Sequence, residues 1–374
     1  MVGAVRGGAV RWAAALIAGL LVAGAAAGQG MRAEGLPVGA QIVESAPLDG
    51  MGRPDRALVL WMQAPRRVER PAGEPYTCPD RTRGSHWHGP ARLSLVTVPE
   101  GRVIDTLPVG PADAFDLPFR LAPGLSYVVP AETVEPAPGG GPAEGVPRLL
   151  HLYDGTGDGR RGEVAFYDAQ ACMGLATTLF GYDPEADSLR QYPVVLEVVD
   201  PQGRRGVRTD LWVDYLHARG PVALGTWRHA IDYTGRGGLL EAYDVRFDPA
   251  RGVFAGTLTQ YEADRAPPRD VGAETIAAFY HALARGDGMV AASMVVPEKR
   301  GRRPYDPAEM TRFYGGLAVP LQLTALRRDG PDRYTVSYRW ASSDKSRCET
   351  EAAVTLRDVD GFPSIANIVP REGC

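Results

Sequence analysis

The chain has 374 residues, and its 41 Lys and Arg side chains against 45 Asp and Glu side chains give a net charge of −4. This slightly acidic balance argues against a nucleic-acid partner, because nucleic-acid-binding domains carry a basic surface. After the first 27 residues no stretch has the run of about 20 apolar residues that crosses a bilayer, so the remainder is not expected to span a membrane.

Residues 1–27 have the pattern of a secretory signal peptide. Arg6 and Arg11 supply a positive start, residues 12–27 form an apolar run, and residues 25–27 are three alanines suited to cleavage. The alternative is an uncleaved N-terminal anchor. We expect cleavage, and therefore a periplasmic or secreted protein whose partner is an unknown small molecule or an envelope component.

Four cysteines are expected to form two disulfides in such an oxidising compartment. They are Cys78, Cys172, Cys348 and Cys374. Four cysteines allow three pairings. We predict Cys348–Cys374, because both lie on what reads as one terminal hairpin, and Cys78–Cys172 then follows by elimination.

The first two thirds of the chain are predicted to be rich in β-structure. Residues 28–55, rich in Gly, Pro and Ala, are predicted to be a flexible lead-in to a β-rich domain at 56–262. Alternating apolar residues around a turn predict a hairpin over 91–107. Further strands, including 149–153 and 211–217, are separated by turn residues. This pattern is typical of a β-sandwich or a partial propeller, and the sequence does not choose between them.

The most specific candidate for a functional site is the sequence DGTGDGRRGE at residues 154–163. Oxygen-bearing residues recur there between glycines, which suits a hard cation such as Ca²⁺. The predicted ligands are the side chains of Asp154, Thr156, Asp158 and Glu163 and the carbonyl oxygen of Arg160.

This loop resembles the short calcium loops of integrin-type and related bacterial repeats, which run Asp-x-Asn-x-Asp-Gly-x-x-Asp. Asp154, Thr156 and Asp158 match the first three side-chain positions. Gly162 stands where the family has Asp, and Glu163 follows as a substitute. Two adjacent arginines oppose cation binding. The alternative is a Gly-Asp hairpin turn without metal, and both interpretations stay open.

A second metal hypothesis concerns His86 and His88. Two residues apart on a strand, their imidazoles would share one face, as in many zinc and copper sites. No third ligand is evident, so a surface loop is the favoured interpretation.

The last hundred residues change in character. Residues 263–271 are predicted to be a linker, and 272–374 a small α+β domain. Helices are predicted over 273–285, from Asp287 to Met294, and from Asp306 to Tyr314, because each has a start or stop signal. Four strands are predicted to follow, at 317–327, 333–340, 347–357 and 364–369.

Three helices followed by a curved antiparallel sheet resemble the nuclear transport factor two-like superfamily, a cystatin-like α+β cone. The resemblance implies a pocket inside the cone, between helices and sheet. The residues that would line it are Tyr280, His281, Tyr305, Tyr314, Tyr338 and Trp340. Members include isomerases, dehydratases and non-catalytic domains, so the fold does not identify a function. Aromatic core packing is the favoured interpretation of these residues.

The leading functional hypothesis is a non-enzymatic binding or envelope-associated protein. It is motivated by the lack of a G-x-S-x-G elbow, an H-E-x-x-H helix or a phosphate-binding G-x-x-x-x-G-K sequence. One alternative is a hydrolase or isomerase with its site in the C-terminal cone. Another is a structural partner of an envelope complex.

Overall fold

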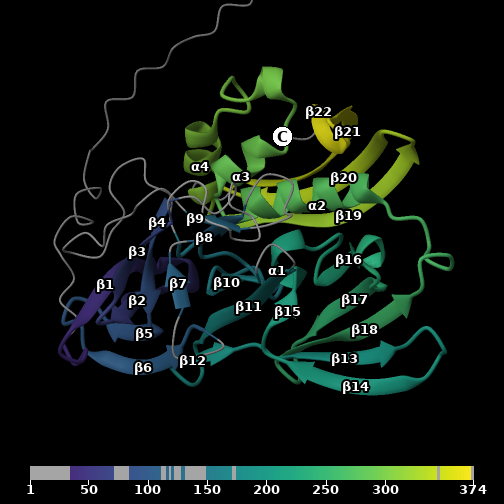
Figure 1. Cartoon of the computed structure of the whole chain (residues 1–374). Coiled ribbons are helices and arrows are strands. Elements are labelled where there is room, and N and C mark those ends of the chain that lie inside the picture. Colours follow the sequence, from purple (N-terminus) through teal and green to yellow (C-terminus); the bar gives the residue numbers. More distant parts are fainter. Residues whose placement is uncertain are drawn as a thin grey trace, which may run out of the picture.

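A computed structural model describes residues 34–70, 84–110, 115–117, 119–121, 128–130, 149–170, 174–342 and 346–371. We call residues 34–262 the β-rich region and residues 271–371 the α+β region. Sheets dominate the first, whereas the longer helices gather in the second beside a separate sheet (Figure 1). The predicted fold class, a mostly β part followed by an α+β part, is confirmed.

The N-terminal sheet has the strand order β1-β2-β5-β6 and is antiparallel. Its strands are β1 (Ala40–Leu48), β2 (Arg53–Gln63), β5 (Ala91–Thr97) and β6 (Val103–Pro108), with the short helix η1 (Asp49–Met51) after β1. The hairpin predicted at 91–107 is confirmed as β5 and β6. Small sheets beside it contain β3 (Arg66–Arg70), β4 (Gly84–Gly89), β7 (Phe115–Leu117), β8 (Phe119–Leu121) and β9 (Val128–Pro130).

Two further sheets complete the β-rich region. One contains β10 (Glu163–Gln170), β11 (Gly174–Asp183), β12 (Ser188–Gln191) and β15 (Val213–Asp214). The other has the order β14-β13-β18-β17-β16, with strands Arg205–Asp210, Val194–Val199, Val253–Tyr261, Leu240–Asp248 and Thr226–Asp232. The short helices α1 (Leu216–Arg219) and η3 (Thr234–Arg236) lie between its strands in the chain.

Strand β11 is buried on both faces because it separates two hydrophobic cores. Leu175 and Leu179 belong to the larger core, whereas Phe180 and Tyr182 belong to the core of the N-terminal sheet. Successive side chains of a strand point to opposite faces, so an almost continuous apolar run is required there.

Three predictions for this region are wrong in part. Residues 40–48 belong to the predicted lead-in, yet they pair with β2 as β1. In the predicted strand 149–153 only Tyr153 pairs, in an isolated bridge to Glu163. The predicted strand 211–217 is cut short because Tyr215 adopts a left-handed φ of 57° and α1 begins at the next residue.

The α+β region begins with the three predicted helices, each capped by an aspartate. They are α2 (Val271–Ala284), α3 (Gly288–Ser293) and α4 (Pro307–Gly315), with the short helix η4 (Pro297–Lys299) between the last two. Asp270, Asp287 and Asp306 each accept a hydrogen bond from a backbone N–H of the first turn. The antiparallel sheet β19 (Val319–Gly330), β20 (Arg333–Ala341), β21 (Arg347–Val359) and β22 (Phe362–Pro370) follows.

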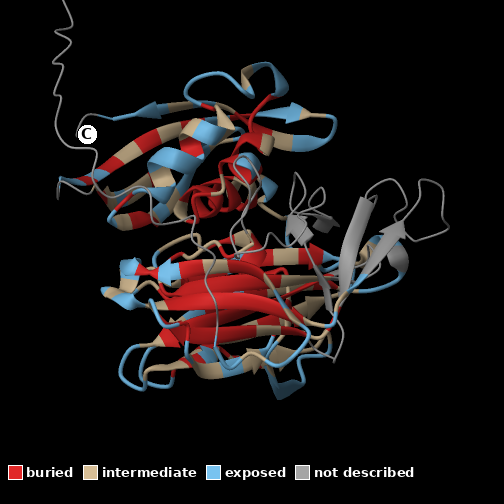
Figure 2. Cartoon of the chain, turned by 90° about the vertical axis from the view of Figure 1, so that its left-hand side faces the viewer, coloured by how far each residue is buried: buried red, intermediate tan, exposed pale blue. Residues whose placement is uncertain are grey.

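One hydrophobic core runs through both regions. It extends from Tyr153 and Trp227 of the β-rich region to Ile276 and Phe279 of α2 and Ile365 of β22. Figure 2 shows buried residues on the interior strands and on the helix between the two sheet systems. The predicted domain boundary at 263–271 stays a prediction. No helix among the described residues is long and apolar enough to cross a membrane.

Candidate functional site

The Asp154 carboxylate organises its own loop. One oxygen accepts hydrogen bonds from the backbone N–H groups of Gly157 (2.7 Å) and Asp158 (3.0 Å), and the other accepts one from Gly159 (2.8 Å). Gly157 and Gly159 have φ values of 84° and 88°, which residues with a side chain rarely adopt. The glycines therefore turn the loop so that its N–H groups surround this carboxylate.

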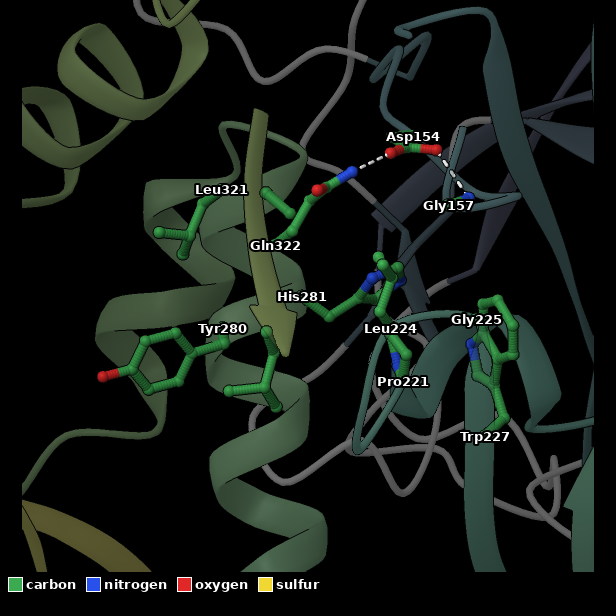
Figure 3. A pocket seen from close by; sticks show the side chains of 12 residues that line it. Asp154, Gly157, Pro221, Leu224, Gly225, Trp227, Tyr280, His281, Leu321 and Gln322 are labelled. Atoms are coloured by element: carbon green, nitrogen blue, oxygen red, sulfur yellow. Dashed lines mark hydrogen bonds between the residues drawn. The ribbon is translucent and has the colours of Figure 1, made fainter. Parts of the chain in front are cut away.

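Asp154 also joins the loop to the α+β region. The side-chain amide of Gln322, on β19, donates a hydrogen bond to it (Figure 3). Nε of Arg339, on β20, donates in turn to the side-chain oxygen Oε1 of Gln322, at 2.6 Å. Burial raises the pKa of Asp154, and the N–H donors of the loop oppose that rise.

The other predicted calcium ligands make hydrogen bonds of their own within the loop or are buried. Glu163 is buried, accepts a hydrogen bond from Gly155 N–H (3.1 Å), and burial raises its pKa well above the usual range. Asp158 accepts one from the backbone N–H of Arg160 (2.8 Å), and Thr156 is buried. In the described ranges no three His, Cys, Asp or Glu side chains are grouped to hold a metal ion. Calcium binding therefore stays a prediction.

Arg161, at the end of the same loop, caps helix α4. Its guanidinium donates to the carbonyl oxygens of Gly315 (2.6 Å) and Tyr314 (2.8 Å). These groups end the helix and carry the negative end of its dipole. The Nε atom is buried without an acceptor, and burial lowers the pKa of Arg161. The arginine that opposed the calcium interpretation thus has a specific place in the fold.

A groove of about 1020 Å³ opens beside α4 and has walls from both regions. We call it the α4 groove. Its lining includes Asp49, Gly50, residues 150–152, Arg161, residues 285–287, Met289, residues 315–318, and the α4 residues Pro307, Ala308, Thr311 and Arg312. Its volume lies at the upper end of the range of small-molecule sites, which is about 300–1,000 Å³.

Charged side chains lie along one wall of the α4 groove. A carboxylate oxygen of Asp287 is 3.6 Å from a guanidinium nitrogen of Arg285 and 3.7 Å from Nε2 of His151. The Arg285 side chain is 4% exposed and also donates to the hydroxyl of Tyr167. Burial alone would lower the pKa of Arg285, but Tyr167 and Asp287 reverse this, so the wall contains a permanent buried cation.

The predicted cone residues take a different place. Tyr280 and His281 border a pocket of only about 30 Å³, the His281 pocket, together with Asp154 and Gln322 (Figure 3). That volume is room for about one water molecule. His281 Nε2 lies 3.0 Å from the carbonyl oxygen of His217, and burial lowers its pKa well below the usual range. The imidazole is therefore neutral at neutral pH.

The remaining aromatic residues of the predicted cone pack on one another. The rings of Tyr280 and Tyr338 are 5.5 Å apart, and Phe313 lies 4.9 Å from Tyr314 and 5.6 Å from Trp340. Tyr280 and Tyr305 are buried core residues, and Tyr314, Tyr338 and Trp340 pack against that core. This arrangement agrees with the core-packing interpretation.

Cys348 is buried in β21 and is not a free thiol. Cys78, Cys172 and Cys374 lie outside the described residues, as do the signal sequence and the side chains of His86 and His88. The cysteine pairing and the histidine metal site therefore stay predictions.

Sequence reasoning missed the α4 groove because its residues come from distant segments. Arg161, Arg285 and Arg312 share no motif, and the small residues between them follow no pattern in the sequence. The one signal in the sequence was the pair Arg160 and Arg161 in the Asp154 loop, because two positive charges do not suit a cation site.

Comparison with known proteins gives little guidance. No family profile and no curated protein matches this chain. A solved structure of an Ntf2-like protein involved in plasmid conjugation is 9% identical, with a TM-score of 0.19 over 56% of this chain and 76% of that one. The resemblance to the nuclear transport factor two-like superfamily therefore stays a prediction.

Proposed function

We propose that this chain is an exported, non-enzymatic binding protein whose ligand lies in the α4 groove. The observation that carries the proposal is a groove of about 1020 Å³ whose walls come from both regions. Sites for small molecules are commonly concave, mixed in polarity and placed where two parts of a protein meet. The ligand would be a small molecule, or part of an envelope component, in the periplasm or outside the cell.

The enzymatic alternative receives less support. It placed the site inside the C-terminal cone, but the His281 imidazole is buried against a carbonyl oxygen next to a pocket of about 30 Å³. A substrate needs more room than one water molecule. The His151–Asp287 pair lies in the α4 groove, where a catalytic role would be a separate proposal.

Filling the groove tests the proposal. Ala308 is exposed on the face of α4 that lines the groove, so Ala308→Trp should block ligand entry without disturbing the core. Native mass spectrometry of the purified chain should find a small-molecule adduct on the wild type and much less on this variant. Ala263→Trp, on an exposed turn after β18, is the matched control and should keep the adduct.

Two outcomes would contradict the proposal. One is an adduct of equal abundance on Ala308→Trp and on the wild type. The other is a wild-type protein without any adduct whose α4 amides show the same hydrogen exchange in buffer and with extracted envelope material.

A further inference from the structure

Two arginine side chains reach the C-terminal end of α4. Arg161 arrives from the β-rich region and donates to the carbonyl oxygens of Tyr314 and Gly315. Arg312 belongs to α4 itself and lies three residues before Gly315. Both residues also line the α4 groove, so two positively charged side chains border it along α4.

Neither arginine has an acidic partner among the residues that the structure describes. The contacts of the Arg161 guanidinium are carbonyl oxygens, which supply only the partial charge of about −0.5 at a helix C-terminus. Arg312 is exposed and makes no side-chain hydrogen bond or ion pair there. By contrast, Arg285 has Asp287 and Arg303 has Glu309.

The position of Arg161 makes a missing counter-charge costly. Its Nε atom is buried without an acceptor, and desolvation lowers its pKa. A desolvated cation is stabilised when an anion replaces the lost water. A guanidinium also matches the planar oxygens of carboxylate and phosphate better than an ammonium does.

The rest of the lining limits where an anion can sit. Asp49 stands on the η1 wall, and Asp287 already faces Arg285 and His151, so negative charge is disfavoured near both acids. Half-buried Leu152 and Met289, which is 55% exposed, give the groove apolar surface, and the buried Leu150 and Leu317 lie behind it. The arginines therefore suit a charged group of a ligand, and the apolar lining suits a hydrophobic part of the same ligand.

We propose that the α4 groove binds an amphipathic molecule through an oxyanion, a phosphate or carboxylate, placed between Arg161 and Arg312. The apolar part of the ligand then lies along Leu152 and Met289. This inference rests on the proposed function, and it adds the chemical class of the ligand and the two residues that recognise it.

Calorimetric titration with two probes tests the inference and separates two sources of the oxyanion. Inorganic phosphate represents a free anion, and dihexanoyl phosphatidic acid, a water-soluble lipid, represents a headgroup with chains. We expect both to bind at about 0.15 M salt, with the lipid at least about tenfold tighter because its chains cover apolar surface. Equal affinities would assign the site to free phosphate and remove the apolar half of the proposal.

Arg312→Gln should weaken both probes at least about tenfold, which corresponds to one charge-assisted hydrogen bond. Arg302→Gln is the matched control, because Arg302 is exposed, carries the same charge and does not line the groove. Its affinities should stay within about twofold of wild type. Equal weakening in both variants would mean diffuse charge attraction and would overturn the inference, as would no weakening in Arg312→Gln.

Failure of this inference can be told apart from failure of the proposed function. If neither probe binds the wild type, but Ala308→Trp still loses its adduct, the groove binds a ligand of another class. If Ala308→Trp keeps its adduct while Arg312→Gln also binds both probes normally, both proposals are wrong.

Discussion

The α4 groove and the His281 pocket are both built where the two regions meet, yet their volumes are about 1020 and 30 Å³. The smaller one is bordered by Tyr280, His281 and Trp227, whose large side chains fill the space between sheet and helix. The larger one is bordered by glycines and alanines, which leave space open, and by charged side chains such as those of Arg285 and Asp287. Aromatic residues thus fill the interior at the smaller pocket, whereas small and charged residues without a sequence motif form the groove.

The largest expected effect comes from removing an aromatic residue beside the His281 pocket. Tyr280 is 4% exposed and packs on Tyr338. Tyr280→Ala should lower the free energy of unfolding by about 3–5 kcal/mol, because it leaves a cavity in the core. Urea unfolding measures this. Ala308→Ser, on the open groove, is the control and should change stability by no more than about 0.5 kcal/mol.

A Tyr280→Ala variant as stable as the control would mean that the ring is not part of the core. The contrast between a packed pocket and an open groove would then fail.

A smaller effect is expected at Gly286, where α2 ends beside the α4 groove. Its φ is 69°, and an added Cβ would lie 2.8 Å from the Cα of Gly315. Gly286→Ala should therefore cost about 2 kcal/mol or more from backbone strain and crowding of α4. The matched control is Gly203→Ala, where φ is 79° but nothing lies within 4 Å of the added atom. Its cost should be about 1 kcal/mol.

Unfolding curves for the two glycine variants separate strain from contact. Equal losses of stability would show that Gly286 and Gly315 do not need to approach closely, and that α4 can move away from α2.

The remaining expected effect depends on pH and concerns Glu163 in the Asp154 loop. Burial raises the pKa of Glu163 well above 4.5, so the folded protein holds this proton more tightly than the unfolded chain does. Below pH 4.5 both states are protonated; as the pH rises above that value the protein loses stability. Glu163→Gln should match wild type near pH 4 and be more stable at pH 7, by about 1.4 kcal/mol for each tenfold difference in proton affinity between the folded and unfolded chains.

Calcium sharpens this test. A bound Ca²⁺ would keep Glu163 ionised, so calcium would raise the melting temperature of the wild type and a chelator would lower it. Glu163→Gln and Asp158→Ala would remove that response. If wild-type melting is the same with calcium and with chelator, the predicted calcium loop is wrong and the loop serves only as a joint between the regions.

The candidate site was predictable only in fragments. The sequence singled out residues 154–163 because of their Asp and Gly pattern, and the structure does give that loop a defined conformation. The partners Gln322 and Tyr314 could not be predicted, because each contact joins residues more than 150 positions apart. The spacing of Asp and Gly residues predicts the turn, whereas the tertiary positions of α4 and β19 determine which residues the turn contacts.

The sequence by itself determined the three C-terminal helices, the aspartate caps of the second and third, and the alternating strands after them, because these depend on neighbouring residues and hydrogen bonds within one or two turns. Only the tertiary structure decided that His281 is buried and neutral and that Arg161 and Arg312 both line an open groove. Burial, electric field and empty volume are properties of segments that come together from distant parts of the chain, and no local pattern records which segments will meet.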